Sequence, residues 1–216
     1  RAAQESRGLG DVYKRQVNGG GITVFGDVKN TGNGLTNAPV INLSNTASVK
    51  AVGDAALYAA GVGIWYIDGG TYEGLSTIGA KSGKFVINNG MFIATGVPKT
   101  GELYGNGIIS TGSVIQIENN KGYAGNIEIT VNGGTFKSEK GLSIYHYPPN
   151  NEEGETNTLK SLIINGGTFT SDVKMVKGDN VSVTNGTFST KTLESYIPNT
   201  YCLLYTSPSP RDSWAS

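Results

Sequence analysis

Side chains that commonly carry chemistry are few in this chain, and one small group of them stands together. The 216 residues include a single His and a single Cys. The histidine, His146, lies between Tyr145 and Tyr147. Tyrosine rings stack on sugar faces and their hydroxyl groups form hydrogen bonds, so these three residues predict a small carbohydrate-binding patch. A lone histidine is more often a surface residue or one bonded locally, and that interpretation stays open beside the first.

A second candidate is a set of polar residues at one recurring position of the chain. Its members are Asp68, Asn88, Asn132 and Asn165. A row of such side chains could bind a sugar or calcium. It could also form a stacked ladder at a turn, in which each side chain hydrogen-bonds the backbone of its neighbour. We favour the structural ladder.

The carboxylates show no catalytic pattern. A glycosidase needs a pair of carboxylates that face one groove. The five aspartates between residues 17 and 201 are instead scattered, and Glu152, Glu153 and Glu155 lie in a polar stretch, residues 147–158, that predicts an exposed loop. Phosphate-binding glycine motifs do not occur in the context they need. We therefore expect no catalytic residues, no metal site and no cofactor.

Charge and cysteine content exclude several classes of protein. Lys and Arg number 17, as do Asp and Glu. This balance argues against a dedicated binder of nucleic acid or of anionic membranes. One His and one Cys exclude zinc knuckles and a disulfide framework. No apolar run approaches the roughly 20 residues that a membrane helix needs, so we expect no membrane insertion in this segment.

A repeated box must position the candidate residues. It consists of two apolar residues in alternation, a polar glycine-containing turn, and a residue pair that ends in an aromatic ring. The box occurs at residues 67–72, 87–92, 131–136, 164–169 and 183–188, with offsets of 20, 44, 33 and 19 residues. We interpret these offsets as one unit, two units, one unit with an insertion at residues 147–158, and one unit. Each alternating pair predicts a short strand with one buried face.

Strands this short cannot each bury a face alone. Winding the chain into stacked coils solves this, because equivalent residues then lie about 4.8 Å apart along one axis. The aromatic residues Tyr72, Phe92, Phe136, Phe169 and Phe188 would form a column in the core. At about 20 residues per coil, the repeats predict about nine coils. An antiparallel sandwich would instead need hairpin turns at closer spacing.

Both ends of the chain resemble translated sequencing-adapter sequence, read on opposite strands. The motif Asp11-Val12-Tyr13-Lys14-Arg15-Gln16 carries the resemblance at one end, and Cys202-Leu203-Leu204-Tyr205-Thr206-Ser207 carries it at the other. The resemblance implies that residues 1–16 and 202–216 are adapter-derived artefacts. Residues 17–201 would then be a repeat domain from a longer protein. We expect the ends to pack poorly unless they extend an end coil.

The Asn-Gly-Gly-Thr-Phe box, with its apolar pair before it, resembles the repeats of parallel β-helix proteins of the pectin-lyase-like kind. It is also similar to Gly/Thr/Asn-rich repeats of large secreted or wall-attached bacterial proteins. The resemblance implies an all-β fold, a single-stranded right-handed parallel β-helix (solenoid) with about 20 residues per coil. It also implies an extracellular or cell-surface location and neighbouring domains in the same chain. A lyase of this kind would use a basic residue, often Arg, and residues 17–201 contain no Arg.

These observations predict a non-catalytic structural or adhesin-like segment of a bacterial secreted or cell-surface protein. A polysaccharide or a host or cell-surface glycan is the expected partner, and nucleic acid is not. One alternative is a truncated β-helix carbohydrate-active enzyme, a polysaccharide lyase or glycosidase, whose catalytic coils are missing or lie in residues 101–126. Three carboxylates in one groove would favour it. The other alternative is a carbohydrate-binding module.

Overall fold

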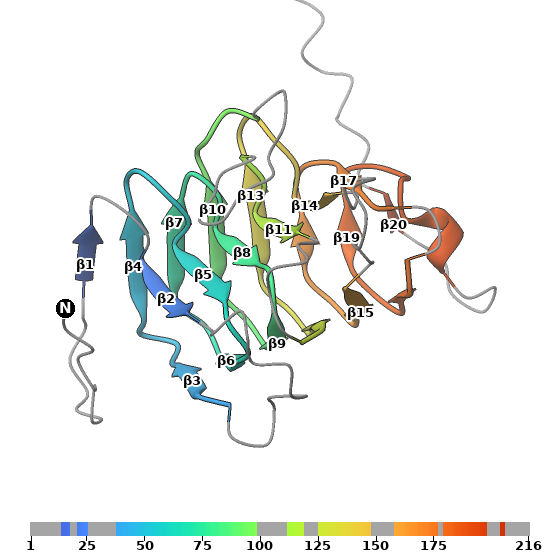
Figure 1. Cartoon of the computed structure of the whole chain (residues 1–216). Coiled ribbons are helices and arrows are strands. Elements are labelled where there is room, and N and C mark those ends of the chain that lie inside the picture. The colour runs from blue at the N-terminus through green and yellow to red at the C-terminus, as the bar shows by residue number, and fades with distance from the viewer. Residues whose placement is uncertain are drawn as a thin grey trace, which may run out of the picture.

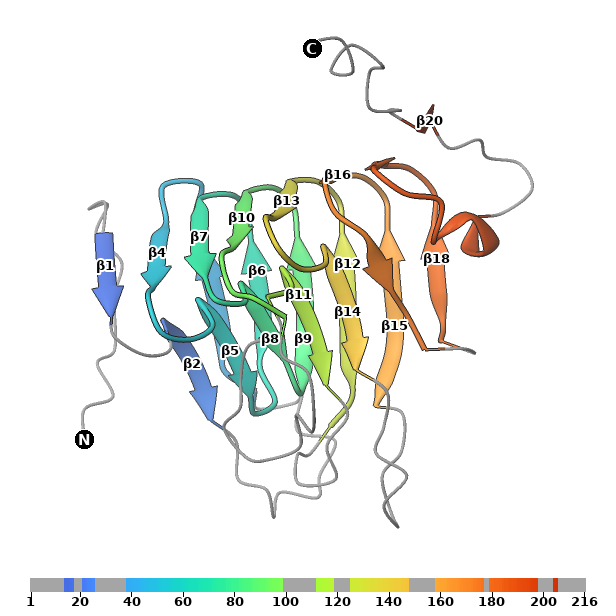
Figure 2. The same ribbon diagram turned by 90° about the horizontal axis from the view of Figure 1, so that it is seen from above.

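The chain winds into a stack of parallel coils (Figures 1 and 2). The computed structural model describes residues 14–17, 21–25, 38–98, 112–118, 125–147, 158–176, 179–197 and 204–205. Their strands form three sheets, here named A, B and C, and each pairing between neighbouring strands is parallel. This confirms the predicted all-β parallel β-helix. No helix within these ranges is long and apolar enough to span a membrane.

The strands of each sheet follow one another in chain order along the stack. Sheet A contains β1 (Lys14–Val17), β4 (Ser48–Ala51), β7 (Thr71–Gly74), β10 (Met91–Ala94), β13 (Thr135–Ser138), β16 (Thr168–Phe169), β19 (Thr187–Phe188) and β20 (Leu204–Tyr205). Sheet B contains β2 (Ile22–Phe25), β5 (Leu57–Ala60), β8 (Ile78–Ala80), β11 (Ile115–Glu118), β14 (Ile144–Tyr147) and β17 (Val173–Lys174). Sheet C contains β3 (Val40–Leu43), β6 (Ile64–Ile67), β9 (Gly83–Ile87), β12 (Ile127–Val131), β15 (Leu159–Ile164) and β18 (Val181–Val183).

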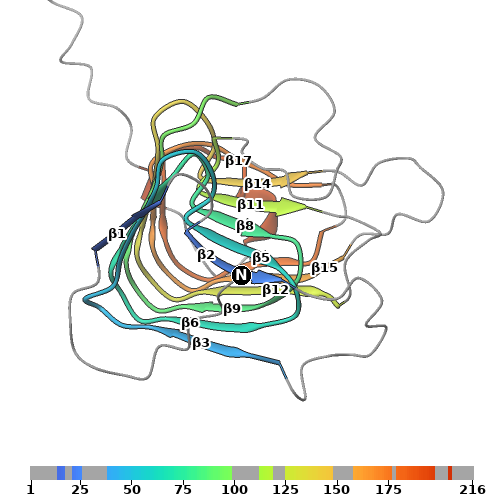
Figure 3. The ribbon, with the colours of Figure 1, turned by 60° about the vertical axis from the view of Figure 1, so that its left-hand side comes forward.

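Each coil runs through one strand of sheet B, one of sheet C and one of sheet A. Figure 3 views the stack nearly end-on, so that successive coils lie one behind another. The described strands make six such coils, so the prediction of about nine was wrong. Part of the error lies in the offset of 44 residues, which is one coil and not two, because Phe92 pairs directly with Phe136. Long connections, residues 95–114 before β11 and 119–126 after it, account for the extra length.

Apolar side chains form columns inside the coils, as the repeat predicted. In sheet C, Trp65 pairs with Phe85, and Phe85 pairs with Ile129 in the next coil. Trp65 and Phe85 stack with their ring centroids 5.7 Å apart. In sheet A the five predicted aromatic rings are all buried, and each stacks on the next with centroid separations between 4.7 and 5.1 Å. These separations equal the distance between neighbouring strands, so the side-chain column follows from the parallel register.

The corner from sheet C to sheet A is the most regular part of the coil. It is three residues long in five of the six coils, and it contains the polar-glycine turn of the repeated box. Gly70 and Gly134 there have φ angles of 96° and 103°, a backbone conformation that other residues adopt only with strain. The other two corners, on either side of sheet B, vary in length. The longest connections at these corners are residues 95–114, 26–39 and 148–158.

Two strands extend sheet A at its ends. Strand β1 begins within the adapter-like N-terminal stretch and pairs with β4. Strand β20 lies within the adapter-like C-terminal stretch and pairs with β19. The 3-10 helix η2 (Glu194–Tyr196) follows the last coil, where Leu193 joins the buried core and Ile197 packs against it. Figure 2 shows this helix at the C-terminal end of the stack.

Candidate functional site

The outer face of sheet B differs from the outer faces of the other two sheets. In sheets A and C, buried and more exposed side chains alternate along most strands, as in Thr71–Gly74 and Ile64–Ile67. In sheet B, β5, β8 and β11 are buried on both faces. Ile78 and Ile115 belong to the central core, whereas Tyr58 belongs to a separate small cluster. Polar side chains occupy the outer positions beside this second cluster.

A buried ion pair joins β11 to the end of β8 on this face. The Lys81 Nζ and Glu118 Oε2 atoms lie 2.7 Å apart, and the two side chains are only 1% and 6% exposed. The Lys81 Nζ atom also lies 5.6 Å from the centre of the Tyr58 ring. Burial disfavours the charged carboxylate more than Lys81 favours it, so the pKa of Glu118 rises to about 7.

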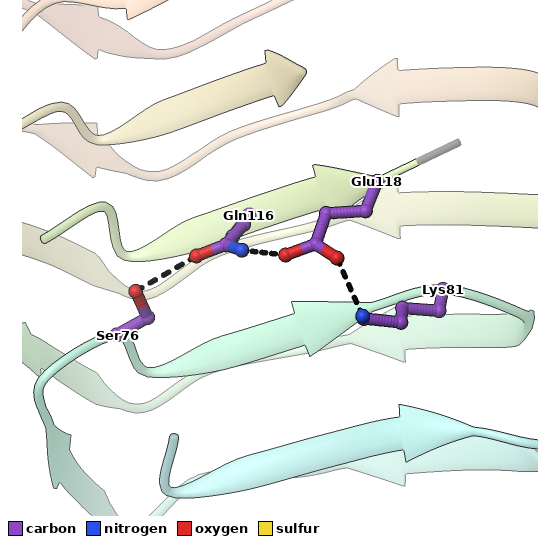
Figure 4. A network of polar contacts seen from close by, with 4 residues as sticks. All are labelled: Ser76, Lys81, Gln116 and Glu118. Carbon is purple, nitrogen blue, oxygen red and sulfur yellow. Dashed lines mark hydrogen bonds and ion pairs between the residues drawn. The ribbon is translucent and has the colours of Figure 1, made fainter. Parts of the chain in front are cut away.

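The ion pair continues into a chain of hydrogen bonds along the face (Figure 4). Gln116 Nε2 donates a hydrogen bond to Glu118 Oε1. Ser76 Oγ donates one to Gln116 Oε1, with a distance of 3.0 Å between the two oxygens. Ser76 precedes β8 and Lys81 follows it, so the chain of contacts runs from one end of β8 to the other through two side chains of β11. These four residues, here called the sheet-B network, are all buried.

The network contains one group, the Glu118 carboxyl, that can exchange protons near neutral pH. A carboxyl group with a pKa of about 7 both accepts and releases a proton there, and it contacts an amine on one side and a carboxamide on the other. The network also ties β8 to β11, the two sheet-B strands that the longest connection separates in the chain. The same contacts therefore support both proton exchange and the link between β8 and β11.

The sheet-B network was not predicted from the sequence. Alternation within β11 does carry a signal, because Ile115 and Ile117 point to the core and thereby place Gln116 and Glu118 on the opposite face. Lys81, the partner of Glu118, follows β8 on the preceding coil. Only the register between β8 and β11, set across a long connection, brings Lys81 to Glu118.

The structure places the predicted tyrosines together but separates the histidine from them. Tyr145 and Tyr147 are half-buried on the outer side of β14, with ring centroids 5.5 Å apart and planes at 80°. The Lys174 Nζ atom lies 5.4 Å from the centre of the Tyr145 ring. Burial, and then the neighbouring Tyr147, raise the pKa of Tyr145. His146 alternates with them and points to the interior.

His146 is a buried partner of Asp179 rather than a surface residue. Its Nδ1 atom lies 2.6 Å from Asp179 Oδ2, and both side chains are fully buried. The same carboxylate oxygen accepts a hydrogen bond from the backbone N–H of Val176 at 2.9 Å. The contact therefore joins Asp179, which lies just before β18, to β14. The three-residue patch predicted from the sequence reduces to the two tyrosines, with Lys174 beside them.

The second candidate set forms one continuous row at the corner between sheets C and A. Asn88 Nδ2 donates to Asp68 Oδ1 at 2.7 Å, and Asn132 Nδ2 donates to Asn88 Oδ1 at 2.8 Å. Asn165 Nδ2 donates to Asn132 Oδ1 at 3.0 Å, and Thr184 Oγ1 ends the row on Asn165 Oδ1. The hydrogen bonds join side chain to side chain. The row is therefore linked by its side chains and not, as predicted, by a bond from each side chain to the backbone of its neighbour.

Two predicted features fall mainly outside the described residues. These are the loop at 147–158, with Glu152, Glu153 and Glu155, and most of the stretch 101–126. Within the described ranges, no group of three or more His, Cys, Asp or Glu side chains is placed to hold a metal ion.

Comparison of the chain with protein families, with curated proteins and with solved structures finds no match.

Proposed function

We propose that the chain is a non-catalytic, rod-like structural segment of a bacterial secreted or cell-surface protein, adhesin-like in type. The observation that supports this most strongly is the row from Asp68 to Thr184, in which each side chain is hydrogen-bonded to its equivalent in the next coil. The aromatic column stacks in the same direction. Side chains at recurring positions thus serve coil-to-coil contact, which suits a stiff spacer.

An activity assay tests the proposal. The purified chain is incubated with acidic and neutral polysaccharides across a range of pH values, and new reducing ends and unsaturated products are measured. We expect neither product above a heat-denatured control. Sustained turnover by the purified chain would overturn the structural proposal and favour a β-helix polysaccharide lyase or glycosidase.

A second candidate function is glycan binding on the outer face of sheet B, at β14. Tyr145 and Tyr147 support it, because both are half-exposed and lie together, and tyrosine combines an aromatic ring with a hydroxyl group, the groups that bind sugars. The double variant Tyr145→Ala/Tyr147→Ala should then lose retention on a glycan array. Tyr66→Ala, which removes an exposed tyrosine from sheet C, is the control and should retain binding. Equal retention by both variants would remove the tyrosine site.

A further inference from the structure

The sheet-B network brings an amine and a carboxamide to the same carboxylate. Glu118 Oε2 lies 2.7 Å from the Lys81 amine, and Glu118 Oε1 accepts from the Gln116 carboxamide nitrogen. Figure 4 shows Lys81 and Gln116 on the two sides of the Glu118 carboxylate. An amine and a carboxamide react to give a new amide and ammonia when a neighbouring group moves the protons between the two nitrogens.

We propose that Lys81 and Gln116 become joined by an intramolecular isopeptide bond, which the folded chain forms by itself with Glu118 as proton carrier. The bond would link Lys81 Nζ to Gln116 Cδ. It would make this part of the outer face of sheet B a site of covalent self-modification. The proposal rests on the contacts of the network and does not depend on the proposed rod function.

The reaction balances without any further reagent. Glu118 takes one proton from the Lys81 ammonium group, and the neutral amine attacks Gln116 Cδ. Glu118 then gives its proton to Gln116 Nε2 and takes the second proton from the attacking nitrogen. The bond between Gln116 Cδ and Nε2 breaks, ammonia leaves, and the proton on Glu118 departs with it as ammonium. One amide replaces another, so no atom is oxidised or reduced.

Ser76 occupies the position that such a reaction needs. Its Oγ donates a hydrogen bond of 3.0 Å to Gln116 Oε1, the oxygen that becomes negatively charged when the amine attacks. A donor aimed at the developing charge stabilises the transition state, and its effect is largest where water is excluded. Ser76 is fully buried.

Burial favours the reaction in two further ways. A buried site withholds the water that would otherwise hydrolyse the intermediate. The pKa of Glu118, raised to about 7 by burial, suits a group that must both take and return a proton. Geometry supplies a third factor, because the Glu118 carboxylate lies between Lys81 and Gln116 and contacts both nitrogens.

The cross-link would join two neighbouring coils that a long connection separates in the chain. It would join β8 to β11 and close a loop of the chain that contains residues 95–114, the longest connection between consecutive strands. A bond that closes a long loop restricts the unfolded chain and so favours the folded one.

Intact mass spectrometry of the denatured full chain tests the proposal. The wild-type chain should be lighter than its sequence mass by one ammonia. Tryptic digestion should then leave Lys81 uncleaved, with the peptide that contains Gln116 attached to it. Lys81→Arg and Glu118→Gln should both have their sequence masses. Lys160→Arg is the matched control, because Lys160 forms an exposed 2.7 Å ion pair with Glu128, and it should keep the ammonia loss.

Several results would overturn the proposal. One is a wild-type chain at its sequence mass. Loss of one water instead would indicate a direct amide between Lys81 and Glu118. An ammonia loss that persists in Lys81→Arg would indicate cyclisation of an asparagine elsewhere. If the Lys81→Arg variant fails to fold, the tryptic peptides of the wild-type chain still decide, since cleavage after Lys81 contradicts the cross-link.

Discussion

Phe136 and Phe169 stack face to face, with ring centroids 4.7 Å apart and planes inclined by 6°, although 33 residues separate them in the chain. Phe92 and Phe188 extend the stack in the two directions. A separation close to the spacing between strands means that each ring lies directly over its equivalent in the neighbouring coil. The column thereby connects the register of sheet A to the packing of the core.

Replacing a ring in the middle of this column should cost more than replacing one near its end. Phe136→Ala removes a fully buried ring that stacks on both sides, so we expect the free energy of unfolding to fall by about 3–5 kcal/mol. Phe188→Ala removes a ring with one described stacking partner and should cost less. Urea denaturation followed by circular dichroism measures both losses. A Phe188→Ala loss equal to or above that of Phe136→Ala would contradict the column.

The asparagine row predicts a smaller and more local effect. Asn132 donates to Asn88 and accepts from Asn165, so Asn132→Ala removes two hydrogen bonds at an exposed corner. We expect a loss of about 1 kcal/mol in unfolding free energy. The control is Asn42→Ala, at an exposed position of β3, which should change stability by less. If both variants unfold at the same urea concentration, the row contributes nothing measurable.

The turn between β6 and β7 requires glycine at position 70. Gly70 has a φ angle of 96°, and a Cβ atom added there would lie 2.5 Å from the backbone oxygen of Ala47. Gly70→Ala should therefore destabilise the chain by about 2 kcal/mol or more. Gly63→Ala is the comparison, because its added Cβ would meet its nearest atoms at 3.4 Å. Thermal unfolding midpoints of the two variants give the answer, and a milder effect at Gly70 would refute the requirement.

The repeated parts of the fold could be predicted from the sequence, and the irregular coil could not. The apolar pairs, such as Trp65 and Ile67, and the aromatic column were predictable because each short strand and its turn form a local pattern that repeats. The length of the coil that contains β11 was not, since the connections of residues 95–114 and 119–126 make this coil as long as two ordinary ones. This coil and the other long connections, residues 26–39 and 148–158, together made the predicted number of coils too high.

In the candidate site too, only the contacts that a local sequence pattern determines could be predicted. The pairing of Tyr145 with Tyr147 follows from the alternation of a strand, and the same alternation turns His146 toward the interior and Asp179. The contact between Lys81 and Glu118 depends on a register across two coils. No local pattern specifies such a register, so the sheet-B network emerged only from the structure.

The raised pKa of Glu118 predicts how stability depends on pH. Its ordinary value is 4.5 and its value in the folded chain is about 7, so the folded state holds this proton more tightly than the unfolded state. The stabilisation is therefore complete below about pH 4.5 and is lost as the pH rises toward about 7, by on the order of 3 kcal/mol. Burial is the leading cause, so the direction is the same whether Lys81 is an ammonium group or an amide.

The variant Glu118→Gln isolates this contribution. The unfolding free energy of the wild-type chain minus that of the variant should decrease between about pH 4.5 and 7, because only the wild-type chain carries the titrating group. Glu128→Gln, which removes a more exposed carboxylate that pairs with Lys160, should not show this decrease. A difference between wild type and Glu118→Gln that grows with pH would show that the sign is wrong.

Parallel stacking of successive coils is the claim on which the other conclusions depend, and an engineered disulfide tests it most directly. Thr130 on β12 pairs with Ile163 on β15. Neighbouring strands lie about 4.8 Å apart, within the Cα separations that a disulfide spans. In a Cys202→Ser background, Thr130→Cys/Ile163→Cys should form an intramolecular disulfide on air oxidation of the folded chain. Thr130→Cys/Lys174→Cys, whose second site lies on sheet B, should not. Failure of the first pair to bond, or equal bonding in both, would contradict the parallel β-helix.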